Sequence, residues 1–104
     1  MAISLPEVVR LPHFHLVSFR VRNKIFATIH EKENRVMLKL RLLDQSVFCA
    51  FDKAVIYPVP GGWGRKGATF FDLEKMKVSM MKDALTAAWA STAPKKLVEE
   101  FRRK

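Results

Sequence analysis

Apolar and polar residues alternate along residues 19–40, FRVRNKIFATIHEKENRVMLKL, where β-branched and aromatic residues also concentrate. This pattern predicts three short strands joined by two tight turns. We expect the first turn at Arg22-Asn23-Lys24, because asparagine tolerates the left-handed conformation that a tight hairpin needs. The second turn falls over residues 31–34. We expect the rest of the chain to be organised around these three strands.

Successive side chains of a strand point to opposite faces of its sheet, and here the two faces differ in chemistry. One face is suited to a core and carries Phe19, Val21, Ile25, Ala27, Ile29, Val36, Leu38 and Leu40. The other face is basic, with an occasional Phe or Met, and carries Arg20, Arg22, Lys24, Phe26, Thr28, His30, Arg35, Met37, Lys39 and Arg41. The sequence therefore predicts a sheet with one apolar face and one cationic face.

Two further segments flank these strands. Residues 3–9 predict an extended or single-turn lead-in, because Pro6 and Pro12 each bias the preceding residue away from helix. After the strands, apolar residues recur every four positions along residues 42–51, and this spacing predicts a short helix with Asp44 as its N-cap. The apolar stripe of this helix, which we expect to pack on the sheet, consists of Leu43, Val47 and Phe51.

The second half of the chain predicts another hairpin followed by helices. Residues 55–59 have strand character, and two prolines place this strand at a sheet edge or end it early. The glycine-rich residues 61–67 predict a flexible loop, and residues 68–73 complete the hairpin. The period becomes helical from Ser79, the expected cap, and Pro94 ends that helix and begins the last one. The two helical stripes are Met81, Leu85 and Trp89, and Leu97, Val98 and Phe101.

These elements predict a two-layer α+β fold. Three strands, a short helix and two strands give an antiparallel sheet of about five strands, because the turns are too short for parallel crossovers. The C-terminal helices pack on this sheet. With 104 residues the chain is one domain, residues 1–104, large enough to bury a core without disulfides.

Composition narrows the class of protein. The chain is 49% hydrophobic and 28% charged, as is ordinary for a globular domain. Its apolar runs fall short of the ~18 residues of a membrane span, and the N-terminus lacks a secretory pattern. A single cysteine, Cys49, excludes an internal disulfide, and a reducing cytoplasm is the expected compartment. The unusual feature is the net charge of +9, which favours polyanionic partners such as nucleic acid.

The basic sheet face and the glycine-rich loop are the candidate binding sites. Cations spaced along a sheet can follow phosphates, and an aromatic side chain among them can stack on a base. The candidate nucleic-acid-binding residues are Arg20, Arg22, Lys24, Phe26, Arg35, Lys39 and Arg41 on the sheet, and Trp63, Arg65 and Lys66 on the loop. The alternatives are a solvated sheet face, a face partly covered by the terminal helices, and a loop that is only a mobile hairpin tip.

Other chemistry finds little support in the sequence. His13 and His15 would lie on one side of an extended chain, and His30 could join them, but a metal site needs further ligands. Cys49 lies among apolar residues, where cysteine behaves as a small hydrophobe. The paired glutamates lie in polar surroundings, and the glycine-rich loop lacks the GxxxxGK[ST] spacing of a phosphate cradle. We therefore expect no catalytic residues, metal, cofactor or small-molecule substrate, and no nucleophile–base pair indicates an enzyme.

Four segments together resemble the MmcQ/YjbR family of small bacterial proteins. They read SFRVRNKIFATI, VMLKL, AVIYPVPGGWGRKGATFFDL and DALTAAWASTAPKKL, and their order and spacing match from about Leu5 to Leu97. The resemblance implies a two-layer α+β fold with an antiparallel sheet, similar to that of bacterial secretion chaperones and compared also with frataxin-like folds. The family is commonly labelled DNA-binding, with no assigned catalytic residues.

One departure from the family concerns the N-terminus. Family members usually open with a full helix ahead of the segment that matches residues 5–8, and only four residues precede it here. An uncovered apolar surface would then favour a homodimer. Two hypotheses follow: a non-enzymatic DNA-binding protein of low sequence specificity, or a chaperone-like protein-interaction module, or homodimer, that does not bind nucleic acid.

Overall fold

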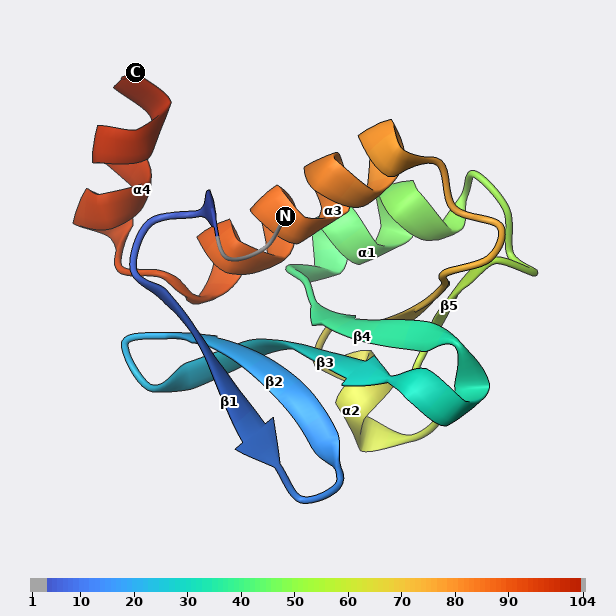
Figure 1. Ribbon diagram of the computed structural model, residues 1–104. Coiled ribbons are helices and arrows are strands. Elements are labelled where there is room, and N and C mark those ends of the chain that lie inside the picture. The colour runs from blue at the N-terminus through green and yellow to red at the C-terminus, as the bar shows by residue number, and fades with distance from the viewer. Residues whose placement is uncertain (1–3, 104) are drawn as a thin grey trace.

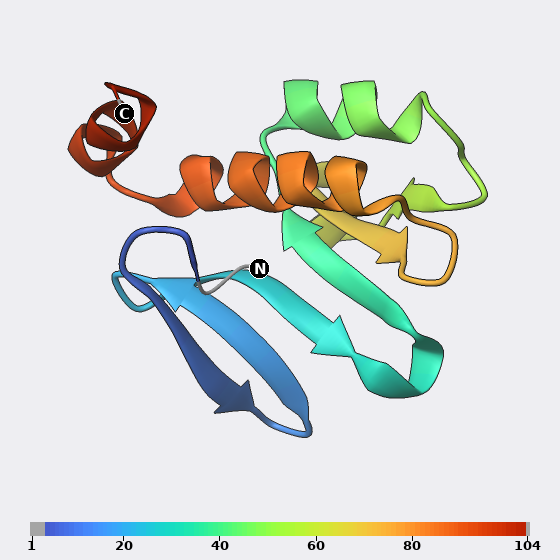
Figure 2. The same ribbon diagram turned by 45° about the horizontal axis from the view of Figure 1, so that its top comes forward.

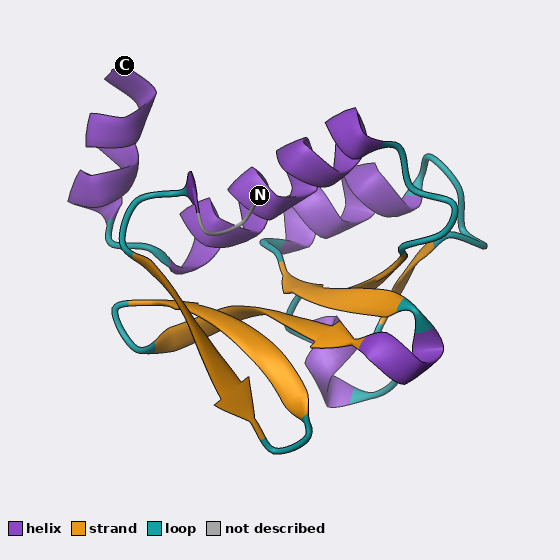
Figure 3. Cartoon of the chain, viewed as in Figure 1, coloured by secondary structure: helices purple, strands orange, loops and turns teal. Residues whose placement is uncertain are grey.

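The computed structural model describes residues 4–103, which form a two-layer α+β fold (Figures 1 and 3). Six antiparallel strands make one sheet in the order β1-β2-β3-β4-β6-β5. The strands are β1 (Val8–His13), β2 (Leu16–Val21), β3 (Lys24–His30), β4 (Arg35–Lys39), β5 (Ile56–Pro58) and β6 (Ala68–Asp72). The helices are the 3-10 turn Glu31–Glu33, α1 (Leu42–Cys49), α2 (Gly62–Arg65), α3 (Val78–Thr92) and α4 (Lys95–Arg103). The predicted fold class is confirmed.

The helices divide between the two faces of the sheet. Figures 1 and 2 show α1 and α3 side by side over one face, with α4 at the end of the helical layer and α2 against the opposite face. We call the face turned away from α1 and α3 the open face. Helix α3 covers the middle of the sheet through contacts with β3 and β4, whereas α1 contacts the edge strand β5.

The three predicted central strands are confirmed as β2, β3 and β4. Arg22 and Asn23 both adopt left-handed backbone angles, with φ of 51° and 66°, and Val21 pairs with Lys24 across them. Two consecutive residues with positive φ match the twist of a two-residue hairpin. The next turn ends at Asn34, whose φ is 51°. Asparagine therefore stands where each turn requires a left-handed residue.

The core lies between α3 and the sheet. The predicted stripe of α3 is buried, and its centre is Trp89, which is fully shielded from solvent. The Trp89 indole N–H donates a 3.0 Å hydrogen bond to the carbonyl oxygen of Pro6, which ties the N-terminal segment to this helix. Phe26, Leu38 and Phe71 contribute to the same core from the sheet, with no solvent exposure. The α4 stripe is also as predicted, with Val98 buried.

Two predicted helix caps are wrong, and one predicted lead-in runs into a strand that was not expected. The lead-in predicted over residues 3–9 is a turn over residues 4–7, and from Val8 the chain forms an edge strand, β1, which holds Pro12 where a missing N–H need not pair with a neighbour. Helix α3 begins at Val78, so Ser79 is not its cap. Helix α1 has Arg41 rather than Asp44 as its N-cap residue.

The side of α1 that faces the sheet is also not the predicted one. Its stripe is exposed, at 76% for Leu43, 53% for Val47 and 64% for the neighbouring Phe51. Gln45 is the buried residue of this helix instead. Since α3 occupies the middle of the sheet, α1 covers the edge formed by β5 and β6, where the Gln45 amide donates hydrogen bonds to the Ala68 carbonyl oxygen and the Thr69 hydroxyl.

Candidate nucleic-acid interface

The open face is organised around a hollow between β3 and β4. Pairing of these two strands stops at Ala27 with Leu38, but β4 continues to pair with β6 as far as Lys39 with Ala68. The strands therefore diverge beyond that point. The fully buried Phe26 belongs to the core below. The opening above is a hollow of about 470 Å³.

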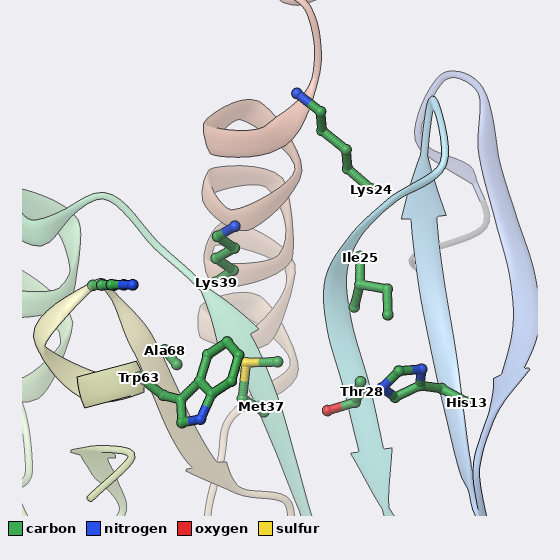
Figure 4. A pocket seen from close by; sticks show the side chains of 9 residues that line it. His13, Lys24, Ile25, Thr28, Met37, Lys39, Trp63 and Ala68 are labelled. Carbon is green, nitrogen blue, oxygen red and sulfur yellow. The ribbon is translucent and has the colours of Figure 1, made fainter. Parts of the chain in front are cut away.

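Side chains from five elements line this hollow (Figure 4). They are His13, Lys24, Ile25, Thr28, Met37, Lys39, Trp63, Lys66 and Ala68. Figure 4 shows Lys24 and Ile25 on the β3 side and Lys39, Trp63 and Ala68 on the opposite side. Three of the lining residues are exposed lysines, and no Asp or Glu is among the described lining residues. The hollow thus combines apolar side chains with a positively charged rim.

Trp63 and Lys66 are held in place rather than carried on a mobile loop. The sequence predicted a flexible loop over residues 61–67, but the chain forms the helical turn α2. The buried amide of Gln45 donates a 2.9 Å hydrogen bond to the carbonyl oxygen of Gly64 and a 3.0 Å hydrogen bond to the Thr69 hydroxyl. The prediction failed because the anchoring Gln45 belongs to α1, which is remote from the loop in sequence.

Close backbone approaches explain two glycines of this turn. A Cβ on Gly64 would lie 1.9 Å from the carbonyl oxygen of Val59. A Cβ on Gly67, whose φ is +112°, would lie 1.9 Å from the carbonyl oxygen of Leu40. Only glycine fits such approaches, and at Gly67 the backbone angle also favours it. The turn is therefore packed against both neighbouring strands.

Two predicted arginines are engaged by neighbours on the sheet. Arg35 lies with its guanidinium carbon 3.7 Å from the centre of the Phe70 ring and donates a 3.1 Å hydrogen bond to the Tyr57 hydroxyl. Arg22 lies on the hairpin turn and forms a bidentate ion pair with Glu7. The hydrogen bond between them lowers the pKa of Glu7 and raises the pKa of Arg22. Both guanidinium groups are thus less available to an anion.

Arg20 and Arg65 remain accessible outside the hollow. The Arg20 guanidinium donates to the Ser18 hydroxyl at 3.1 Å and to the Pro12 carbonyl oxygen at 3.4 Å, so it lies along β1 and β2. Arg65 is exposed in the last turn of α2 but does not line the hollow. Of the predicted set, the structure brings Lys24, Lys39, Lys66 and Trp63 together.

Phe26 and Arg41 do not lie on the open face, contrary to the prediction. A register shift places Arg20 opposite Ile25 but Phe19 opposite Ala27, so β3 has one extra residue here. This bulge turns Phe26 into the core and Ile25 toward the hollow. Arg41 follows the end of β4 and lies beside α3 and α4.

Sequence reasoning missed five of the nine lining residues as binding residues. Ile25 was assigned to the core, Ala68 was given no role, and Thr28 and Met37 were placed on the cationic face without a binding role. His13 was considered only as a metal ligand. Thr28 could have been found from its predicted place on the cationic face, but the sequence carries no signal of the bulge that exposes Ile25.

The histidines do not assemble into a metal site. His13 ends β1, and the β1–β2 turn at Phe14 and His15 follows, so this stretch is not the extended chain that was expected. Within residues 4–103, no group of three potential ligands among His, Cys, Asp and Glu could hold a metal ion. His30 shares a 3.0 Å hydrogen bond with the Thr28 hydroxyl, and burial lowers its pKa.

Cys49 is half-buried on α1, and burial raises the pKa of its thiol. A raised pKa leaves less of the reactive thiolate at neutral pH. Such a thiol acts in packing, and Cys49 does contact the main hydrophobic core.

A second, apolar groove lies on the helical side of the sheet. It encloses about 260 Å³ beside α3, and no charged residue is among the described residues that line it. The lining residues are Phe19, Ala27, Ile29, Val36, Leu73, Met81 and Leu85.

Comparisons with protein-family models, with curated proteins and with solved structures each found no match for this chain. Among residues 4–103, no helix has both the length and the apolar character that crossing a bilayer requires.

Proposed function

We propose that this chain is a non-enzymatic DNA-binding protein of the MmcQ/YjbR type, which contacts the nucleic-acid backbone through its open face and through α2. The observation that carries this proposal is the hollow with Lys24, Lys39 and Lys66 at its rim and the exposed Trp63 beside them. Three ammonium groups around one opening attract a polyanion, and no carboxylate among the described lining residues opposes them.

The contacts available here suit phosphates more than a particular base sequence. Each lysine that neutralises a phosphate releases condensed counterions, which makes binding favourable and dependent on salt. Phosphate contacts position a protein on nucleic acid without reading sequence. Arg20, which is partly exposed, and Arg65, which is exposed, add positive charge outside the hollow. We therefore propose binding of low sequence specificity.

The proposal includes a reducing, cytoplasmic setting in a bacterial cell. The single cysteine of the sequence supports the compartment, and the resemblance to the MmcQ/YjbR family supports the bacterial source. Neither the proposed binding nor the half-buried thiol calls for an oxidising environment.

Fluorescence anisotropy with labelled random-sequence DNA at several salt concentrations tests the proposal. The test variant is Lys24→Gln/Lys39→Gln/Lys66→Gln. The matched control is Lys53→Gln/Lys75→Gln/Lys96→Gln, which removes three exposed lysines outside the hollow and so has the same net charge. We expect the test variant to lose affinity and to reduce the slope of log affinity against log salt by roughly 2 to 3.

The control separates local contacts from general attraction. It should keep most of the slope, since its lysines line no part of the hollow. Equal losses in both variants would contradict a site at the hollow. Absence of binding by the wild type at low salt would rule out the proposed function.

A second candidate function is favoured by the apolar groove beside α3. A homodimer would bury it, and the exposed stripe of α1 on the same side offers a second copy an apolar helix face. Sedimentation velocity over a range of concentrations tests this, with Leu73→Lys placing a charge at the partly exposed rim of the groove. A dimer that the variant dissociates would support the alternative, whereas a monomer at every concentration would exclude it.

A further inference from the structure

We infer that the hollow between β3 and β4 holds one unpaired base stacked on Trp63, so that the chain binds single-stranded nucleic acid in preference to duplex. This inference rests on the proposed function and specifies whether the bound nucleic acid is single-stranded or duplex. It is carried by the shape of the hollow, the placement of Trp63, and the distribution of lysines around the opening.

The hollow has the size and lining of a site for a flat, partly apolar group. Its volume of about 470 Å³ lies within the roughly 300–1,000 Å³ of ordinary ligand pockets. Ile25, Met37 and Ala68 supply apolar lining, and Thr28 and His13 add groups that can donate or accept hydrogen bonds. Apolar lining with a few adaptable polar groups suits a nucleobase without selecting one base strongly.

Trp63 is exposed on an anchored turn, which suits a stacking platform. The residue is 75% exposed, although tryptophan is highly buried on average in folded proteins. The turn that carries it is anchored by the 2.9 Å hydrogen bond from Gln45 to the carbonyl oxygen of Gly64, the next residue. Little loop order therefore has to be gained when a base arrives.

The exposed indole can stack on an unpaired base but not on one within a duplex. In a duplex both faces of each base are covered by neighbouring base pairs, so a base must be unstacked and extruded before a protein ring can reach its face. A single strand presents its bases without that cost. The stacking interaction at Trp63 therefore favours single strands.

The lysines lie where the phosphates of a continuing strand would pass. Lys24 lies on the β3 side of the opening and Lys39 on the β4 side (Figure 4). Lys66, which directly follows α2, also lines the opening. A strand with one base in the hollow has a phosphate on each side of that nucleotide. Cations on both sides of the opening match this arrangement better than they match a mononucleotide, which carries its phosphate on one side.

The experiment measures affinity at low salt for three probes of equal length: an oligo-thymidine strand, an abasic strand with the same backbone, and a duplex. We expect the oligo-thymidine strand to bind roughly tenfold or more tightly than the other two, because only it can stack. Trp63→Ala should reduce its affinity to that of the abasic strand and leave abasic binding unchanged. Trp63→Phe, which keeps a ring, should be intermediate.

Phe51→Ala is the matched control, because Phe51 is a similarly exposed aromatic residue just after α1, which covers the other sheet face. It should bind all three probes as the wild type does. Trp63 emission should change on binding oligo-thymidine, while the buried Trp89 contributes a constant background.

The probes separate failure of this inference from failure of the proposed function. If the strand, the abasic strand and the duplex bind equally and Trp63→Ala has no effect, the single-strand inference is overturned while nucleic-acid binding stands. If thymidine monophosphate displaces the strand at a similar concentration of nucleotide, the hollow is a mononucleotide site and the inference is also overturned. If no probe binds, both proposals fall.

Discussion

The fold disfavours the charged form of His30. Burial lowers the pKa of its imidazole, Glu33 raises it, and Arg35 and His15 lower it further. The folded state therefore releases the proton at a lower pH than the unfolded chain, whose histidine pKa is about 6.5. As the pH falls below about 6.5, the unfolded state binds protons first, and the free energy of unfolding decreases.

Urea denaturation at about pH 7 and about pH 5 measures this prediction. The wild type should be less stable at the lower pH, and His30→Gln should lose part of that dependence because its amide does not titrate. An equal pH dependence in both proteins would show that His30 does not cause it.

The bulge in β3 shows where prediction from single residues ends. Strict alternation assigns Ile25 to the core and Phe26 to the open face, and one extra residue opposite Arg20 reverses both assignments. A bulge depends on the register between two paired strands, and the sequence of one strand alone does not determine that register. The sequence therefore predicted the lysines and tryptophan of the site but not the apolar side chains between them.

Helix α2 is the element on which the site depends, and its glycines give a direct test. Gly64→Ala would bring a Cβ to 1.9 Å from the Val59 carbonyl oxygen, whereas Gly62 has nothing within 4 Å of the same position. We expect Gly64→Ala to lower the free energy of unfolding by about 1–3 kcal/mol, as overpacking does.

Gly62→Ala is the matched control for this prediction. Alanine is the better helix former, so stability should be unchanged or slightly higher. Chemical denaturation of both variants provides the comparison. Equal stability of the two would contradict the tight packing of α2 against Val59.

Substitutions in α1 and β4 test which side of α1 faces the core. Leu43 is 76% exposed, so Leu43→Ala should change the free energy of unfolding by about 0.5 kcal/mol or less. Leu38 on β4 is fully buried, and Leu38→Ala should cost about 2–5 kcal/mol. Thermal or urea unfolding measures both, and a large loss for Leu43→Ala would restore the orientation that the sequence predicted.

The contrast between α1 and α3 explains for which helices the buried face could be predicted from the sequence. In α3 the stripe through Met81 and Trp89 is apolar and the rest is largely polar or small, so its buried face is unambiguous. In α1 apolar residues occur on several sides, with Phe48 and Cys49 turned inward and Leu43 outward. The helical period alone cannot choose between such sides. Tertiary contacts of the buried Gln45 decide the choice.

At the scale of the whole molecule, the fold class followed from strand alternation and short turns, which are local properties of the chain. The sixth strand, β1, could not be predicted from these local properties, because it contains Pro12 and most of its residues are exposed at the sheet edge. The hollow could not be predicted either, since it requires β3 and β4 to diverge. Local patterns thus predict layers, while sites between strands depend on pairing geometry.

The net charge of +9 predicts opposite effects of salt on stability and on binding. Like charges repel one another in the compact state, and added salt screens them over a Debye length of about 10 Å at 0.1 M. Within residues 4–103, Glu7 and Arg22 form an ion pair whose two side chains are about half exposed, so screening it costs little. The melting temperature of the free protein should therefore rise as sodium chloride is added.

The stabilisation conferred by a bound DNA strand should shrink over the same range, because counterion release becomes less favourable. Differential scanning fluorimetry with and without the strand measures both trends in one series. The Lys24→Gln/Lys39→Gln/Lys66→Gln variant, with three fewer charges, should show a smaller rise with salt and little effect of the strand. A melting temperature that falls with salt would mean that attraction between charges outweighs repulsion in this fold, and the basic surface would then serve stability rather than binding.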